Sequence, residues 1–317
     1  MAILVITFIS KILMKGLFVW LVCFASATSA LAGNADTVKL KQHLLAITNT
    51  AQPRNHQHTE SLNQVADYIR NEFEQLNGNV QEQTYTVAGS EYRNIIRSVG
   101  PTDAPRLVVG AHYDVCGDQP GADDNASGVA GLLELARLLQ KHTLPFRVDF
   151  VAYTLEEPPY FRTEHMGSYV HAKSLSGQQT RVMGMISLEM IGYFKDEKGT
   201  QRYPVAPMKL FYGNRGNYIA LVQRFGNGSF GRSLLRNYKK AATLPVKSLR
   251  APAFVSGVDF SDHLNYWQFG FDALMITDTS FYRNSNYHQA TDTIYTLDFG
   301  RMAQVVDAVY TSILKLP

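Results

Sequence analysis

Three short apolar runs in this chain each lead into a residue that can bind a metal ion. They are residues 107–109 before His112, residues 148–154 before Glu156 and Glu157, and residues 182–188 before Glu189. Runs of this kind are typical of strands that are buried on both faces of a sheet. Because ligands bind at the carboxyl ends of the strands in open α/β sheets, we expect these side chains to meet at one edge.

Further periodic segments predict the rest of the fold. Apolar residues recur at helical spacing in residues 59–77, where Thr59 is a candidate N-cap, and in residues 127–142. More strands are expected at residues 80–87 and 92–99, joined as a hairpin, and at residues 208–212 and 273–277. We interpret the less regular residues 213–257 as a helix with irregular structure at the rim of the cleft, where a lid would lie. The alternation predicts an α/β fold, a single three-layer domain with a central mixed, mostly parallel sheet flanked by helices.

The charge balance argues against one class of partner. The 30 lysines and arginines include Lys11 and Lys15, so residues 33–317 carry 28 basic side chains against 27 acidic ones. A nearly neutral chain does not favour nucleic acid or an anionic membrane as its main partner. A hydrophobic content of 45% and a charged content of 18% are typical of a globular protein.

The N-terminus has the pattern of a secretory signal. Lys11 and Lys15 precede an apolar run at residues 17–24, and small residues follow up to Ala32. We expect a signal peptide at residues 1–32, a domain at residues 33–317, and an exported protein that is periplasmic or secreted. It would then have no stable membrane partner. The alternative is an uncleaved segment that anchors the chain in a membrane.

Two more motifs complete a set of residues with metal-ligand chemistry. Asp124 lies in Gly121-Ala-Asp-Asp-Asn-Ala-Ser-Gly128, and His288 lies in Tyr287-His-Gln-Ala-Thr-Asp292. Two imidazoles and three carboxylates suit a pair of divalent cations, with zinc as the best match. Asp124 stands at a glycine-flanked helix entrance and is the natural bridge between two ions. Asp123 and Asn125 are expected to cap the helix or to satisfy its free N–H groups. The set predicts metal-assisted hydrolysis.

Neighbouring carboxylates can divide the chemical work. One of Glu156 and Glu157 can bind an ion while the other takes a proton from the attacking water. Ligating histidines usually pass their second N–H to a carboxylate, and Asp114 and Asp292 fit that role by spacing.

Each signal also has an ordinary explanation. A Glu-Glu pair is usually solvated, and the glycine-flanked motif alone could be a turn with a helix cap. Glu189 is harder to dismiss, because a carboxylate that ends an apolar run needs a partner. Cys116, the one cysteine after residue 32, is a candidate ligand or reactive thiol. We interpret it as a small residue packed beneath the site, because the ligand set is complete without it.

The motifs in combination resemble the M28 family of co-catalytic zinc peptidases, which includes aminopeptidases and glutamate-carboxypeptidase-like proteins. The resemblance rests on Gly110-Ala-His-Tyr-Asp114, the Asp124 motif, Leu155-Glu-Glu157, Leu188-Glu-Met-Ile-Gly192, Ser261-Asp-His263 and His288-Gln-Ala-Thr-Asp292. It implies the zinc-exopeptidase fold and two Zn²⁺ ions. By the family pattern, one ion is held by His112 and Glu189, the other by Glu157 and His288, and both by Asp124.

The resemblance also implies the supporting roles. Glu156 would be the general base, and Asp114 would orient His112. Glu156 and Asp114 are therefore the catalytic candidates. His263 would support the site without binding metal. Many family members carry Asp where Glu189 stands, and the extra methylene would require the backbone to lie slightly farther back.

The implied activity is that of an exopeptidase with a peptide substrate, most simply an aminopeptidase. We expect Tyr282-Arg283-Asn284 to line the substrate pocket. A substrate carboxylate on Arg283, Arg162 or Arg215 would indicate a carboxypeptidase instead.

Two other classes share the fold. Glutaminyl-cyclase-like acyltransferases look single-zinc and lack the pattern around Asp124. Non-catalytic binding domains typically lose ligands. Retention of all five ligands favours hydrolysis.

Overall fold

The computed structural model of the chain describes residues 35–226 and 228–317. The expected signal peptide, residues 1–32, lies outside the described residues. Within the described ranges, no helix is both long and apolar enough to cross a membrane.

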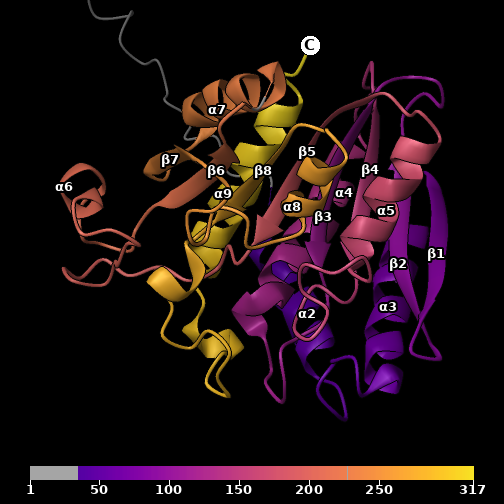
Figure 1. The fold of residues 1–317 in the computed structure, drawn as a ribbon, viewed down its shortest axis with the longest axis horizontal. Coiled ribbons are helices and arrows are strands. Elements are labelled where there is room, and N and C mark those ends of the chain that lie inside the picture. Colours follow the sequence, from indigo (N-terminus) through magenta and orange to yellow (C-terminus); the bar gives the residue numbers. More distant parts are fainter. Residues whose placement is uncertain (1–34, 227) are drawn as a thin grey trace, which may run out of the picture. The chain divides into compact units, whose positions relative to one another are not determined.

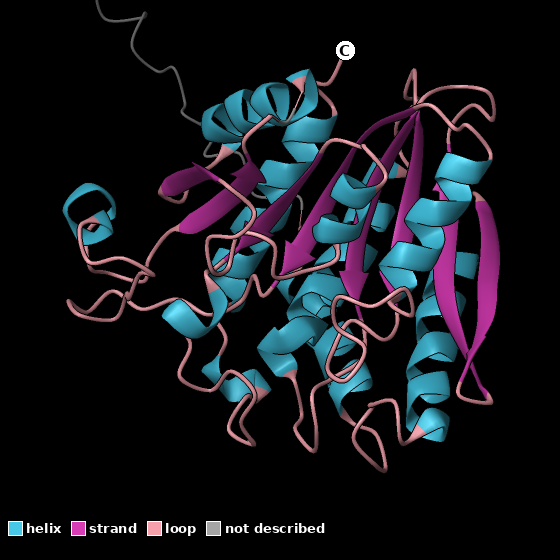
Figure 2. Ribbon diagram, viewed as in Figure 1, coloured by secondary structure: helices cyan, strands magenta, loops and turns pink. Residues whose placement is uncertain are grey.

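The strands of the described residues form one eight-stranded sheet in the order β1-β2-β4-β3-β5-β8-β6-β7 (Figures 1 and 2). Their bounds are β1 Asn79–Val87, β2 Ser90–Val99, β3 Arg106–His112, β4 Arg147–Tyr153, β5 Val182–Glu189, β6 Ile219–Arg224, β7 Val246–Ala251 and β8 Ala273–Thr277. The central strands β4, β3, β5 and β8 run parallel, as do β6 and β7, whereas β1–β2, β2–β4 and β8–β6 pair antiparallel. The predicted mixed, mostly parallel sheet is confirmed.

Helices cover both faces of this sheet, which gives the predicted three layers (Figure 2). One face carries α2 Thr37–Thr48, α3 Thr59–Glu74, α4 Gly128–Leu139, α7 Ser229–Ala241 and α9 Phe299–Ile313, and the other carries α5 Gly167–Gly177 and α8 His263–Gln268. Each face has its own apolar core, and β3 contributes to both. Leu107 and Val109 belong to one core while Val108 belongs to the other, as expected of a strand buried on both faces.

Several local predictions were wrong. Residues 208–212 form the short helix α6 Met208–Tyr212 and not a strand. The segment interpreted as a helix with irregular structure holds α7, but it also contains β6 and β7, which extend the sheet. The predicted N-cap Thr59 is the first helical residue of α3, and the cap position is His58. Asn55 makes this possible, because its Oδ1 accepts the His58 N–H at 3.2 Å and fixes the turn before the helix.

Candidate metal centre and active site

The predicted ligands meet at the carboxyl edge of the central strands. β3 ends at His112, β5 ends at Glu189, and β4 lies beside β3 with Glu156 and Glu157 following its last residue. His112 Nε2 lies 3.4 Å from Glu189 Oε2 and 3.7 Å from Glu156 Oε2. All of these side chains are buried. The topology therefore brings together residues that are up to 77 positions apart, from His112 to Glu189.

Asp124 lies between the two histidines. Its Oδ1 is 3.4 Å from His112 Nε2, and its Oδ2 is 3.2 Å from His288 Nε2. His288 Nε2 is also 3.3 Å from Glu157 Oε2. The five predicted ligands thus form two groups that share one carboxylate, His112–Glu189 on one side and His288–Glu157 on the other.

The donor atoms of this cluster fit metal ions. Among the described residues, His112 Nε2, His288 Nε2, Asp124 Oδ2 and Glu157 Oε1 are buried and have no hydrogen-bond partner. Buried polar atoms normally have partners, and unpaired ones are costly. His112 Nδ1 donates to the Asp114 carbonyl at 3.2 Å, which leaves Nε2 with the lone pair that a metal ion needs. Zinc takes this combination of imidazole and carboxylate ligands.

The metal-free cluster binds protons where cations would lie. Burial raises the pKa of Glu157 to about 8, with Asp124 adding to the shift. Burial also raises the pKa of Glu156 well above its usual value, although the nearby His112 opposes this. Burial lowers the pKa of His288, but the close carboxylates of Asp124 and Glu157 outweigh it and raise the value to about 10. A site that stabilises so many extra protons has a strong negative field, which favours divalent cations.

Asp114 supports the cluster in a different way from the one expected. Its carboxylate lies 3.5 Å from His112 Nδ1, but the hydrogen bond from this nitrogen goes to the Asp114 backbone carbonyl. The two carboxylate oxygens instead accept the backbone N–H groups of Glu156 and Glu157 at 3.1 and 3.0 Å. Asp114 therefore positions the two adjacent glutamates that follow β4.

Other predicted helpers also have corrected roles. The Asp292 carboxylate does not orient His288 in the hydrogen-bond network of the described residues; it accepts the backbone N–H of Asp124 at 3.1 Å. The N-cap position of α4 is Ser127, but Asn125 satisfies a free N–H at the start of the helix, since its Oδ1 accepts the Gly128 N–H at 3.1 Å. Asp123 does not cap the helix, since its carboxylate accepts from Gly192 and Asn284. Sequence spacing could place these residues near the site but could not give the direction of their side chains.

Backbone conformation near the ligands is unusual at three non-glycine residues. Leu155 before Glu156, Met190 after Glu189, and His288 itself have φ values of 58°, 50° and 56°. Left-handed conformations of this kind cost about 1–3 kcal/mol each and cluster at functional sites. The fold holds at least one of them directly, because the Met190 N–H donates to Asn125 Oδ1 at 3.0 Å.

The Ser261-Asp-His263 motif separates into distinct roles. Ser261 Oγ donates to Glu189 Oε2 at 2.7 Å, a contact that the sequence pattern did not reveal. His263 is fully buried, donates from Nε2 to the Val258 carbonyl at 2.8 Å, and packs edge-on against Trp267. Among the described residues, His263 is not in any of the groups that could hold a metal ion.

Cys116 lies closer to the cluster than a packing role requires. The thiol is half-buried, and its Sγ can form a group with Glu157 and His288 in which the donor atoms all lie within 4.8 Å of one another. Burial, with Glu157 next in importance, raises the pKa of the metal-free thiol to about 12.

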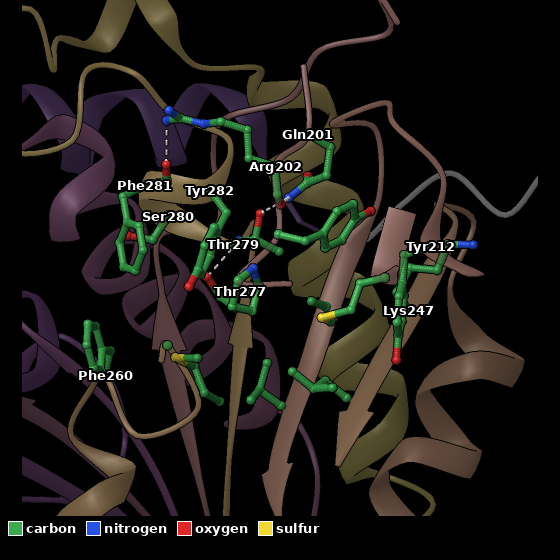
Figure 3. A pocket seen from close by; sticks show the side chains of 18 of the residues that line it. Gln201, Arg202, Tyr212, Lys247, Phe260, Thr277, Thr279, Ser280, Phe281 and Tyr282 are labelled. Atoms are coloured by element: carbon green, nitrogen blue, oxygen red, sulfur yellow. Dashed lines mark hydrogen bonds between the residues drawn. The ribbon is translucent and has the colours of Figure 1, made fainter. Parts of the chain in front are cut away.

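Glu189 of the cluster also lines a neighbouring pocket. Figure 3 shows side chains that line this pocket. Its walls are largely apolar and include Tyr218, Val222, Phe260, Met275, Phe281 and Tyr282. Tyr282 lines the pocket as predicted, but Arg283 and Asn284 do not. The Arg283 guanidinium lies over the Tyr218 ring at 4.6 Å and donates from Nε to Gln201 at 2.9 Å, so packing and hydrogen bonds hold it outside the cavity.

The chain is similar in sequence to a family of peptidases and to several individual proteins. The family model described as peptidase family M28 matches residues 94–313. The chain is 45% identical over 286 residues to the uncharacterized protein YfbL of Escherichia coli strain K12, and the match covers 88% of each chain. It is 26% identical to a probable zinc metalloprotease of Pyrenophora tritici-repentis and 25% identical to leucine aminopeptidase 1 of Ajellomyces capsulatus, over 80% and 73% of this chain. The matches span 58% and 60% of the length of these two relatives.

Two solved structures illustrate the fold relationship. The LapA aminopeptidase of Legionella pneumophila has a TM-score of 0.71 at 20% identity, over 88% of this chain and 70% of that one. The glutaminyl cyclase of Porphyromonas gingivalis has a TM-score of 0.67 at 19% identity, over 89% of this chain and 99% of that one.

Proposed function

The chain belongs to peptidase family M28, and from that premise we propose that it is a di-zinc exopeptidase that removes residues from the free N-terminus of peptides. The observation that carries the proposal is the placement of Asp124 between His112 and His288, 3.4 and 3.2 Å from their Nε2 atoms. One carboxylate between two imidazoles is the arrangement that bridges a pair of ions. Together with Asp124, His112 and Glu189 would hold one metal ion, and His288 and Glu157 would hold the other.

Residues of the chain divide the chemistry around these positions. When bound, zinc supplies Lewis-acid polarisation of the scissile carbonyl and a lowered pKa of the attacking water. Glu156 is the proton carrier, since it is 6% exposed, lies beside His112, and need not complete either ligand group. A carboxylate beside the metal positions can take a proton from water and return it to the leaving amine. Asp114 holds Glu156 at its backbone N–H.

The arginines favour an aminopeptidase over a carboxypeptidase. A substrate carboxylate needs a free cation beside the cluster, and the three candidates are already engaged. Arg283 is held by Gln201, Arg162 pairs with Asp259 at 2.6 Å, and Arg215 donates to the Asp196 carbonyl. None of these three arginines is therefore free to bind a substrate carboxylate beside the cluster.

The pocket next to Glu189 indicates the side chain that the enzyme prefers. Its apolar walls match a large apolar side chain, because burial of apolar surface is the main source of affinity in such cavities. Arg202 lines the pocket but donates to the Phe281 carbonyl at 2.7 Å (Figure 3). We therefore propose that leucine-like and phenylalanine-like N-terminal residues are favoured over small ones.

A substrate panel tests the proposal. Purified protein would be assayed with leucyl, phenylalanyl, alanyl and glutamyl anilides, with N-acetylated dipeptides, and with a peptide that starts with glutamine, each with and without chelator. We expect chelator-sensitive release from unblocked leucyl and phenylalanyl substrates and about two zinc ions per chain. Release of C-terminal residues from acetylated dipeptides would support a carboxypeptidase, and ring closure of glutamine without peptide cleavage would support a cyclase.

Export is a separate part of the proposal. It rests on the pattern of residues 1–32 and predicts that cells fractionated after expression hold a shortened chain outside the cytoplasm. A full-length chain in the membrane fraction would support the anchor instead.

A further inference from the structure

We propose that Cys116 is a thiolate ligand of the metal position formed by Glu157 and His288. The inference rests on the proposed di-zinc site and adds a ligand to one half of it. Its basis is the group in which Cys116 Sγ, a Glu157 oxygen and a His288 nitrogen all lie within 4.8 Å of one another.

Neighbouring donors point to an ion beside the thiol. Glu157 is 4% exposed, and its Oε1 has no hydrogen-bond partner among the described residues. His288 Nε2 is likewise buried without one. A cation bound by these two atoms and by the Cys116 sulfur would give all three donors a partner.

The loop that carries Cys116 is held in place. The Val115 N–H donates to the Arg54 carbonyl at 3.2 Å, and Asn55 Nδ2 donates to the Gly117 carbonyl at 2.8 Å. Arg54 itself is buried and donates from Nε to the Tyr113 carbonyl at 2.7 Å. Contacts on both sides of Cys116 therefore fix its backbone next to Glu157, and only the side-chain torsion remains to be set.

Bond lengths are compatible with direct coordination. Zinc holds sulfur at about 2.3 Å and nitrogen at about 2.0 Å, so two such atoms on one ion lie at most about 4.3 Å apart. The donor atoms of Cys116, Glu157 and His288 already lie within 4.8 Å of one another, which is close to this limit. Binding would release the thiol proton to solvent, as it does at other cysteine sites.

A sulfur ligand would make the two metal positions chemically different. The position of His112 and Glu189 offers nitrogen and oxygen, whereas the position of His288 and Glu157 would also offer a soft thiolate. Soft ligands select zinc over magnesium or manganese. The second position should therefore be the more selective of the two.

Cobalt(II) provides the test, because thiolate coordination adds a near-ultraviolet sulfur-to-metal charge-transfer band that nitrogen and oxygen ligands do not give. The full chain, freed of metal, would be titrated with cobalt(II) chloride while the visible d–d bands report total binding. We expect the charge-transfer band to grow with one of two equivalents and to be lost in Cys116→Ser and Cys116→Ala. Asp118→Asn, an exposed residue of the same loop, is the control and should keep the band.

The outcomes separate this inference from the proposed function. Cobalt that binds with full d–d intensity but without the charge-transfer band, or with a band that persists in both Cys116 variants, overturns the thiolate ligand and leaves the peptidase proposal standing. Failure of the chain to bind cobalt at all overturns the metal centre and the thiolate ligand together.

Discussion

Ser261 donates a hydrogen bond of 2.7 Å from Oγ to Oε2 of Glu189, the last residue of β5. Ser261 Oγ also lies 2.8 Å from Ser187 Oγ, two residues earlier on the same strand. A glutamate has one more rotatable bond than an aspartate, so its carboxylate needs an additional contact to stay in one position. Ser261 supplies that contact and explains how the longer side chain can serve at this place.

Replacement of this hydroxyl should weaken metal binding. In Ser261→Ala we expect the affinity of the His112–Glu189 position for zinc to fall by roughly 10–100-fold, the usual effect of removing a group that orients a ligand. Competition with a fluorescent chelator would measure it. Ser174→Ala is the control, because the Ser174 hydroxyl donates to the His171 carbonyl within α5. Equal zinc affinity in Ser261→Ala and the parent protein would contradict the assignment.

Glu156→Gln should separate metal binding from turnover. The amide keeps the size of the side chain but cannot accept a proton from water, so kcat should fall by roughly 10²–10⁴-fold while zinc content stays the same. Steady-state assay together with elemental analysis would measure both. Glu164→Gln, an exposed residue of the loop after β4, serves as the control. A variant with near-normal kcat would remove Glu156 from the role of base.

Asp114→Asn tests the support of the adjacent glutamates. An amide has one acceptor oxygen, so one of the two backbone N–H groups now bonded to Asp114 would lose its partner and face an NH₂ group. We expect a loss of about 1–3 kcal/mol in the free energy of unfolding, measured by urea titration in chelator so that metal binding does not contribute. The exposed Asp118→Asn is the control. An unchanged midpoint and slope would show that the two hydrogen bonds do not stabilise the fold.

The pocket predicts a change in side-chain preference. Met275 on β8 is 4% exposed and lines the cavity, so Met275→Trp should fill part of it. The ratio of kcat/KM for leucyl over alanyl substrates should fall by roughly 10–200-fold, the discrimination available from apolar pocket volume. Met275→Leu preserves volume and is the matched control. A preference that stays the same in the tryptophan variant would place the substrate side chain elsewhere.

The sequence predicted the positions of the candidate metal ligands better than the roles of the residues around them, and the reason is physical. His112 and Glu189 follow apolar strands, and the carboxyl ends of parallel strands converge whatever the details of packing. Arg283 and Asp292 were placed by spacing alone, which does not determine where a side chain points. The helix α6 was mistaken for a strand because a segment of five residues, four of them apolar or aromatic, is too short to show a clear period. β7 escaped notice because its alternating polar residues suit an edge strand that is only half-buried.

A buried histidine away from the metal centre is expected to make the folded protein sensitive to acid. His43 on α2 is 7% exposed and hydrogen-bonds through Nδ1 to the Tyr68 hydroxyl at 2.7 Å. Burial, assisted by the positive charges of Lys39 and Arg137, lowers its pKa to about 4. The unfolded chain has the ordinary histidine pKa of about 6.5, so it binds a proton in this interval that the folded chain excludes.

Because the unfolded chain binds this proton more readily, acid destabilises the folded protein. The stabilising contribution of neutral His43 is complete above about pH 6.5 and is lost as the pH falls towards about 4, by up to about 3 kcal/mol. In His43→Gln this component should vanish, so the free energy of unfolding should fall less steeply over the same interval. Urea titrations at several pH values in the presence of chelator would measure the slopes, with the exposed His142→Gln as control. Parallel pH profiles for His43→Gln and the parent protein would mean that His43 is not the group that titrates.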